Sequence, residues 1–378
     1  MNDVTDPAPC LVTDILGDPW VSRRLPLTQS PAAPEADHAV LVHQRGAVPA
    51  GHGPRHRRAV LYLHGRNDYF FQTWLADAFL AAGYEFYALD LRACGRAGLG
   101  HPSPHDVRDL RVHDEEIATS LEIIRHEHGH DVVVLNAHST GGLQAAIWAK
   151  DHPGSVEALT LNSPWLDLNS SAIMRSYGSA WVDLVARRDP ERIIDNPSEA
   201  KAVKAAEAAE AAARATIQPH STSDTDPVRH ALGGTSAVGA DPGPVGLDLY
   251  ARSLHARWGG PWDWDLTLKP SPAFPVRAGF LAGVRRLQRE VHHGLGIEVP
   301  VLVCCSTRSC SHDASPEEAR HSDVVLSVRQ IVERSAFLGS DVTVVQVPGG
   351  VHDLALSLSP AREEYLAVLT GWLQARLP

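Results

Sequence analysis

The chain has 378 residues, of which 44% are hydrophobic and 21% are charged, a composition typical of a globular protein with a sizeable core. The formal net charge is −11, and no run of Lys and Arg is dense enough to predict a nucleic-acid-binding face. There is no stretch of about 18 consecutive apolar residues and no signal-peptide layout at the N-terminus, so we predict no transmembrane segment and expect a cytoplasmic protein.

Predicted strands and helices alternate along most of the chain. Such alternation is typical of a mostly parallel sheet with helices on both faces, in which functional groups gather outside the carboxyl ends of the strands. We therefore expect Gly65, Ser139 and Trp165, which each follow a predicted strand, to share one edge of the sheet. The predicted strands span residues 39–43 (a first edge strand), 59–64, 85–91, 132–137, 156–162, 299–305 and 341–347; the predicted helices span residues 73–82, 112–127, 142–150, 276–293, 323–337 and 359–376.

The alternation stops after the strand at 156–162 and resumes only at residue 299. Between these points lies an Ala-rich, low-complexity stretch, followed by a stretch rich in Pro, Gly, Ser and Asp that is typical of a flexible loop. We predict one α/β core interrupted by an insertion that caps the functional edge. Its parts are residues 1–165 (first part of the core), 166–298 (cap or lid, with a low-complexity middle at about 200–246) and 299–378 (second part of the core).

The most informative stretch is VVVLNAHSTGG, residues 132–142. A buried strand, a sharp turn that carries Ser139, and a helix form the arrangement called a nucleophile elbow, which presents a serine hydroxyl at the end of the sheet. Strand and helix nearly collide there, so the residues two positions before and after the serine must be small, as Ala137 and Gly141 are. The usual pattern has glycine at the first of these positions. The alternative interpretation is a glycine-capped strand-to-helix turn without catalytic chemistry.

A serine hydroxyl needs a base to accept its proton and an acid that orients the base. In this architecture the chain order is serine, carboxylate, histidine. His352 follows the last predicted strand in a Gly-Gly loop and is the predicted base. Asp323, which directly precedes a predicted apolar helix, is the favoured acid; in the alternative, Asp323 only caps that helix and Asp313 is the acid.

Acyl transfer also needs donors for the developing oxyanion. We expect the backbone N–H of Thr140, next to the nucleophile, and the backbone N–H of Arg66, after Gly65, to supply them. Aromatic residues near these positions are candidate walls of an apolar substrate pocket, although each fits a core position equally well. They are Tyr69, Phe70, Phe71, Trp165 and Trp181.

Five cysteines are too few and too scattered for a disulfide framework. Cys304 and Cys305, with Cys310 and His312 nearby, have the composition of a metal site. The first two are adjacent in a predicted strand, however, and therefore point to opposite faces of the sheet. We predict no metal and no cofactor.

Several segments together resemble the α/β-hydrolase superfamily, within the serine-hydrolase group that includes lysophospholipases and monoacylglycerol lipases. These segments are LYLHGRNDYFF, YALDLRACGRAG, NAHSTGGLQAAIWA, LNSPWLDL and GGVHDLALS, and they cover most of residues 59–168 and 299–376. The resemblance implies a catalytic triad of Ser139, Asp323 and His352, an eight-stranded sheet, and a lid between the sixth strand and the helix after it. Ala137 and the long polar stretch between Cys305 and Asp323 depart from the family pattern.

These observations predict a metal-independent serine hydrolase that cleaves small or lipid-like carboxylic esters through an acyl-enzyme. An acyltransferase or thioesterase of the same fold is an alternative. A non-catalytic ligand-binding protein with this fold is a second alternative, from a different class. The sequence predicts neither the identity of the ester nor the oligomeric state.

Overall fold

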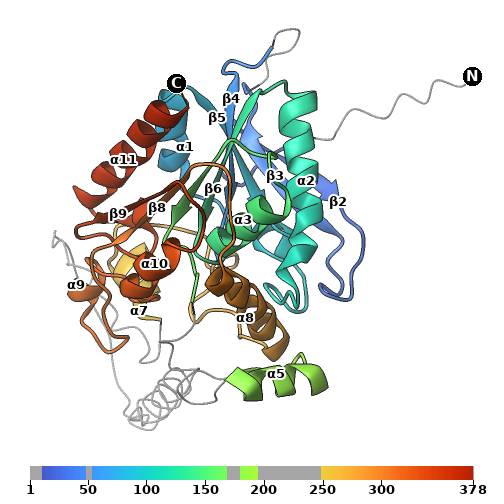
Figure 1. Ribbon diagram of the computed structural model, residues 1–378, viewed down its shortest axis with the longest axis vertical. Coiled ribbons are helices and arrows are strands. Elements are labelled where there is room, and N and C mark those ends of the chain that lie inside the picture. Colours follow the sequence, from blue (N-terminus) through green and yellow to red (C-terminus); the bar gives the residue numbers. More distant parts are fainter. Residues whose placement is uncertain (1–10, 48–52, 168–178, 195–247, 378) are drawn as a thin grey trace, which may run out of the picture.

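The computed structural model describes residues 11–47, 53–167, 179–194 and 248–377. The predicted low-complexity middle of the insertion lies outside the described residues. A nine-stranded sheet in the order β1-β2-β3-β5-β4-β6-β7-β8-β9 forms the centre of the molecule (Figure 1). Its strands are β1 (Leu11–Thr13), β2 (Trp20–Pro26), β3 (His38–Gln44), β4 (Arg58–Leu63), β5 (Tyr84–Asp90), β6 (Val132–His138), β7 (Ala158–Asn162), β8 (Val301–Ser306) and β9 (Val342–Val347).

The neighbouring strands β5, β4, β6, β7, β8 and β9 pair in parallel. The pairs β1–β2, β2–β3 and β3–β5 are antiparallel. The predicted mostly parallel sheet is therefore confirmed, with nine strands instead of eight. The strand at 38–44 is internal and not an edge strand, because β2 covers it. Sequence reasoning missed β2 because Arg23, Arg24 and Pro26 interrupt its apolar pattern.

Helices cover both faces of the sheet, which places two apolar layers around it. Helices α2, α3, α8 and α10 contribute buried side chains to one layer, and α1 and α11 to the other. Successive residues of β4 alternate between the layers, as the two-residue period of a strand requires. The helices are α1 (Thr73–Ala81), α2 (Asp114–Glu122), α3 (Thr140–Asp151), α5 (Ser179–Arg188), α7 (Leu249–Leu254), α8 (Ala278–His293), α9 (Pro316–Ala319), α10 (Val328–Ser335) and α11 (Ala361–Arg376), with short 3₁₀ or π turns at Gly95–Gly98, Leu110–His113, Ile123–Glu127, Ala256–Trp258 and Leu354–Leu356.

The described part of the predicted cap, α5, α7 and α8, follows β7 and lies near one end of the sheet (Figure 1). Helix α8 continues onto the core, because its buried side chains belong to the same apolar cluster as those of α3. A third apolar cluster joins α7 to the loop after β4, through residues such as Tyr69, Phe71 and Tyr250. The cap segments therefore pack directly on the loops that follow the strands.

Helix α10 begins at Val328, five residues later than predicted, and its N-cap is Ser327, whose Oγ accepts from the N–H of Gln330 at 3.4 Å. Asp323 therefore does not cap this helix. The polar loop from β8 extends through Asp323 because a parallel bridge joins Ser309 to Asp323 and holds the residue in extended backbone.

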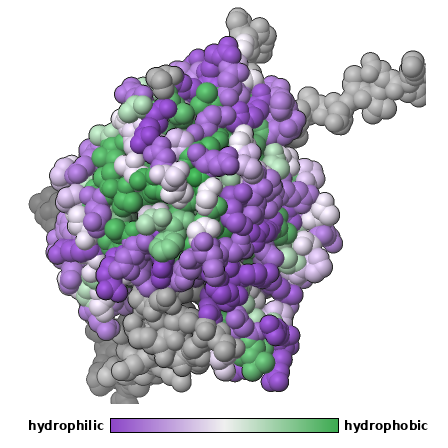
Figure 2. All heavy atoms as spheres, in the orientation of Figure 1, coloured by the Kyte–Doolittle hydropathy of each residue, from purple (hydrophilic) through white to green (hydrophobic). Residues whose placement is uncertain are grey.

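None of the described helices is long and apolar enough to cross a membrane. Figure 2 shows that apolar residues on the viewed face are interrupted by hydrophilic ones. Val12, Ile15 and Leu99 are the most exposed large apolar side chains of the described residues. The absence of a nucleic-acid partner and the cytoplasmic location remain predictions.

A fully buried ion pair fixes the loop after β5. The Arg92 guanidinium is 0% exposed and lies 2.7 Å from the Glu116 carboxylate, which also accepts a hydrogen bond from His113 Nδ1. Burial alone would raise the pKa of Glu116, but His113 and Arg92 outweigh this effect and lower the pKa to about 2. Because the folded pKa lies below the ordinary value of 4.5, the stabilisation is complete above about pH 4.5 and is lost as the pH falls towards 2.

We expect Glu116→Gln to lower the free energy of unfolding by about 3 kcal/mol near neutral pH, because Arg92 remains charged and buried without its main partner. Urea denaturation at about pH 7 and about pH 3 tests this, and the difference from wild type should shrink at the lower pH. Glu333→Gln, which breaks an exposed pair with Arg329, is the matched control and should cost under about 1 kcal/mol. If the free energies of unfolding of variant and wild type differ equally at both pH values, the assigned Arg92–Glu116 ion pair is contradicted.

Candidate active site

Ser139 occupies the turn between β6 and α3, with φ 54° and ψ −117°. A positive φ in a non-glycine residue costs about 1–3 kcal/mol and persists only where the surroundings impose it. Backbone hydrogen bonds do so here: Ser139 N–H donates to Asn162 O at 3.0 Å, and Ser139 O accepts from Trp165 N–H at 2.9 Å. The predicted strand, tight turn and helix are therefore all present.

The small residues around the turn are required by close backbone approach. A Cβ at Gly141 would lie 2.4 Å from the carbonyl oxygen of His64, and a Cβ at Gly65 would lie 3.0 Å from the Cβ of Ser139. The loop after β4 thus runs directly against the elbow. Ala137 stands where the usual pattern has glycine, and it is fully buried in the apolar cluster beneath α3.

We expect Gly141→Ala to lower both stability and hydrolytic activity, because its methyl group would collide with backbone that no rotamer change can move. Gly371→Ala is the control: it lies within α11, its added Cβ would meet no atom within 4 Å, and alanine favours a helix interior. Melting temperature and turnover of a test ester measure both effects. Equal behaviour of the two variants would contradict the close approach.

The loops after β8 and β9 bring a carboxylate and an imidazole to Ser139. His352 Nε2 lies 3.0 Å from Ser139 Oγ, and His352 Nδ1 lies 2.9 Å from Asp323 Oδ2. All three side chains are buried, with Asp323 at 0% exposure. The structure therefore assembles a continuous hydrogen-bonded chain from the carboxylate through the imidazole to the hydroxyl.

Asp323 is held in place from several sides. Its Oδ1 accepts from the N–H groups of Val325 at 2.8 Å and Leu326 at 2.7 Å. Its own N–H donates to Arg308 O, and its carbonyl accepts from Cys310 N–H. Asp313 is exposed in a turn of the same loop and has no contact with His352 among the described hydrogen bonds. Of the two carboxylates that the sequence left open, the structure brings Asp323 to the histidine.

Arg66 and Thr140, whose backbone N–H groups are the predicted oxyanion donors, both line a cavity next to the elbow. Thr140 is the first residue of α3, where backbone N–H groups have no acceptor within the helix. The Arg66 side chain points away to the cap, where Nη2 donates to Phe274 O and Pro275 O and the guanidinium lies 5.3 Å above the Phe280 ring. Segment 274–275 therefore fixes the loop that carries the Arg66 backbone.

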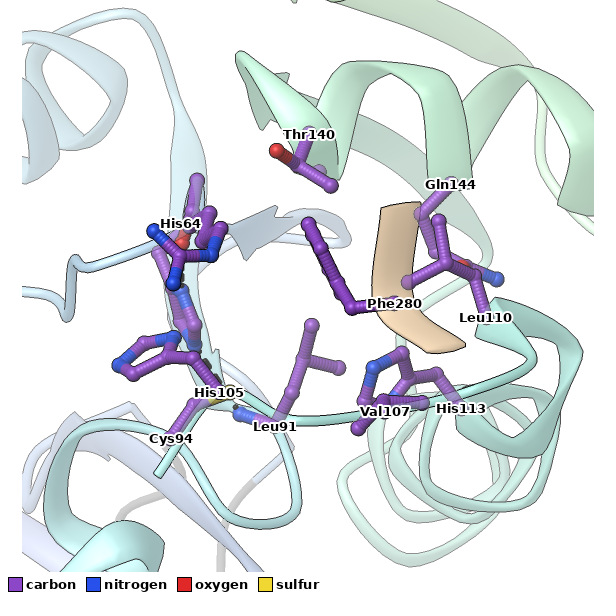
Figure 3. A pocket seen from close by; sticks show the side chains of 13 residues that line it. His64, Leu91, Cys94, His105, Val107, Leu110, His113, Thr140, Gln144 and Phe280 are labelled. Carbon is purple, nitrogen blue, oxygen red and sulfur yellow. Dashed lines mark hydrogen bonds between the residues drawn. The ribbon is translucent and has the colours of Figure 1, made fainter. Parts of the chain in front are cut away.

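A small cavity of about 30 Å³ adjoins the elbow (Figure 3). It shares Gly65, Thr140 and Gly141 with the turn around Ser139. Sequence reasoning missed most of its walls because they come from loops without periodicity and from the far end of the insertion. The lining residues are His64, Gly65, Arg66, Leu91, Cys94, His105, Val107, Leu110, His113, Thr140, Gly141, Gln144 and Phe280.

The predicted aromatic walls do not line this cavity. Phe70 is fully buried on the other face of the sheet, against Trp20 and Phe86, and does not line this cavity. Tyr69 lies in the cluster with α7, where its hydroxyl accepts from Asp265 N–H at 2.8 Å. Trp165 and Trp181 are half-buried and pack against the main core. Phe280 of α8 is the aromatic side chain that reaches the cavity instead.

One group of potential metal ligands occurs among the described residues: Asp68, His138 and Asp353. The Lys269 ammonium donates to Asp68 Oδ1 at 2.7 Å, and Asp353 accepts from Gln72 and Asn162. A divalent cation would have to approach an ammonium already bound there, so the group fits an internal ion network better than a metal site. Cys304 and Cys305 face opposite sides of the sheet, as predicted.

Comparison with known proteins agrees with this fold. The family model described as serine aminopeptidase, S33, matches residues 54–226. The structure is similar to a monoacylglycerol lipase from Paleococcus ferrophilus, with 17% identity, coverage of 86% of this chain and 96% of the other, and a TM-score of 0.52. It is also similar to a thermostable carboxyl esterase from Bacillus coagulans, with 14% identity, coverage of 94% and 99%, and a TM-score of 0.58.

A soluble variant of monoglyceride lipase from Saccharomyces cerevisiae is similar at 15% identity, with coverage of 93% and 99% and a TM-score of 0.53. No curated protein sequence matches the chain. The sheet order, the elbow and these likenesses define an α/β-hydrolase fold. The family match, over residues 54–226, includes the elbow that carries Ser139 and agrees with this fold.

Proposed function

We propose that the protein hydrolyses carboxylic esters through an acyl-enzyme formed on Ser139. The observation that carries this proposal is the hydrogen-bonded chain from Asp323 to His352 to Ser139. With Asp323 accepting from Nδ1–H, the neutral imidazole presents Nε2 as the acceptor for the serine proton. That tautomer is the one that a general base requires.

In the proposed reaction, Ser139 Oγ attacks the ester carbonyl while His352 Nε2 takes the hydroxyl proton. The backbone N–H groups of Arg66 and Thr140 stabilise the oxyanion. His352 then gives the proton to the leaving alcohol oxygen, and the acyl group remains on Ser139. A water molecule deprotonated by His352 attacks the acyl-enzyme and releases the acid.

The cavity favours an ester over a free-amino peptide, although the matching family model is described as serine aminopeptidase. An aminopeptidase needs a negative group beside the scissile bond to bind the substrate's ammonium group. None of the residues that line the described cavity carries a carboxylate, and Leu91, Val107, Leu110 and Phe280 make much of it apolar. The similar monoacylglycerol lipase and carboxyl esterase structures also support an ester.

Parallel assays with p-nitrophenyl esters and amino-acid p-nitroanilides test this proposal. Intact-mass analysis of the enzyme, quenched during ester turnover, tests for the acyl-enzyme. We expect ester turnover, little anilide turnover and a mass increase equal to the acyl group. Anilide turnover above ester turnover would favour a peptidase. No turnover and no adduct would favour the ligand-binding alternative.

The same assay separates hydrolysis from acyl transfer and from thioester cleavage. For a hydrolase, water completes the reaction, so an added alcohol acceptor should leave the yield of free acid nearly unchanged. Conversion of most of the acyl group into a new ester would indicate an acyltransferase. A matched alkyl thioester cleaved faster than the oxygen ester would indicate a thioesterase.

A further inference from the structure

Three buried polar atoms without a hydrogen-bond partner among the described residues belong to side chains that line the cavity beside Ser139. They are His105 Nε2, Thr140 Oγ1 and Gln144 Oε1. Their side chains are 4%, 7% and 1% exposed. An unpaired polar atom at such burial is costly, and a protein usually satisfies it with a ligand or water. In Figure 3 these residues lie around one space, with His105 and Gln144 on opposite sides.

His105 presents a donor there. The N–H of Asn67 donates to its Nδ1 at 3.2 Å, so the proton of the neutral ring is on Nε2. Burial lowers the pKa of His105 well below its ordinary value, which keeps the ring neutral. The ring stacks on Phe274 at 5.3 Å, which fixes its orientation.

Gln144 presents an acceptor. Its Nε2 donates to Asp114 Oδ1 at 3.3 Å, so its Oε1 is the atom without a partner. The Thr140 hydroxyl can donate or accept. A hydroxyl group on a ligand can both donate and accept, so it complements this set of atoms better than a carbonyl or an ammonium group.

The remainder of the cavity limits what carries that hydroxyl. Leu91, Val107 and Leu110 provide apolar walls, and the Phe280 ring projects into the space from α8 (Figure 3). The cavity is small, about 30 Å³, so the part of a substrate that enters it is short.

The position of His352 decides which half of the ester enters. The leaving oxygen must receive its proton from His352 Nε2 and therefore lies on that side of Ser139. His352 does not line the cavity, whereas Gly65 and Thr140, on the oxyanion side, do. The leaving alcohol belongs on the side of His352, so the cavity is assigned to the acyl chain.

We propose that the substrate's acyl group is a short chain that carries a hydroxyl substituent, which His105, Thr140 and Gln144 recognise in this cavity. This inference rests on the proposed function, because it assumes that Ser139 forms an acyl-enzyme with the substrate. A site that is built to bond a hydroxyl discriminates strongly against the analogue that lacks one, because its own buried groups then remain unpaired.

The test compares p-nitrophenyl 3-hydroxybutyrate with p-nitrophenyl butyrate on the wild-type enzyme. We expect kcat/KM to be at least about tenfold higher for the hydroxylated ester. His105→Phe and Gln144→Leu should each bring this ratio towards one. His126→Phe, at an exposed position, is the matched control and should keep the wild-type ratio. A wild-type ratio near one overturns the inference even where a variant fails to fold.

A second measurement separates this inference from the proposed function. Calorimetry on Ser139→Ala compares binding of 3-hydroxybutyrate and butyrate, the two product acids, without catalysis. Tighter binding of the hydroxy acid supports the cavity assignment even if the wild type hydrolyses no ester. Equal binding, with esterase activity that depends on Ser139, would overturn the hydroxyl preference and leave the esterase proposal standing.

Discussion

Ser139→Ala is expected to reduce ester hydrolysis by at least about 10⁴-fold, because the variant has no oxygen to form the acyl-enzyme. The fold should not change. Alanine adopts the same strained φ of 54° as serine, and the backbone hydrogen bonds of the turn do not involve the side chain. The melting temperature should therefore stay close to that of the wild type while turnover disappears.

Ser139→Gly provides a control for this argument. Glycine accepts a positive φ without strain, so this variant should be inactive yet more stable than Ser139→Ala by roughly 1 kcal/mol. Initial rates and denaturation curves measured on the same preparations check both quantities. Residual turnover of Ser139→Ala above a few per cent of wild type would exclude this residue as the nucleophile.

Asp323→Asn is expected to lower kcat by about 10⁴-fold, although the side chain keeps its size. The amide can donate to His352 Nδ1, which moves the imidazole proton to Nε2 and removes the acceptor for Ser139 Oγ. The Oδ1 contacts with the backbone of Val325 and Leu326 can persist, so stability should change less than activity.

Asp313→Asn is the matched control, because this exposed carboxylate lies in the same loop and was the alternative acid of the sequence. It should retain kcat within about twofold of the wild type, as for a surface substitution. Steady-state kinetics of both variants decide between the carboxylates. A large loss in Asp313→Asn with a small loss in Asp323→Asn would reverse the assignment.

The local sequence pattern was sufficient to predict the turn at Ser139 and the position of His352 after the last strand. The elbow at Ser139 depends on one short stretch, in which a buried strand, small residues and a helix must follow each other. His352 was identified because a histidine in a Gly-Gly loop after the last strand has a defined place in the sheet topology. For both residues, the chain order and the sheet topology leave few places in the sequence where such a residue can stand.

The remaining features depend on tertiary packing, which no short window reveals. The Arg-rich β2 is a strand because β3 pairs with it. Helix α10 starts at Val328 instead of Asp323 because the backbone at Asp323 bridges to Ser309. Phe70 has neighbours in sequence that face the cap, but its own ring turns to the opposite side of the sheet. The unpaired polar atoms of the cavity become visible only when His105 and Gln144 meet in space.

Labelling with a fluorophosphonate probe, followed by peptide mass spectrometry, tests the activation of Ser139 most directly. We expect one adduct, on Ser139, that is absent from Ser139→Ala and strongly reduced in a His352→Ala variant, because the imidazole activates the hydroxyl. An adduct on another serine, such as the nearby buried Ser163, or no adduct on the folded wild-type protein, would contradict the proposed nucleophile.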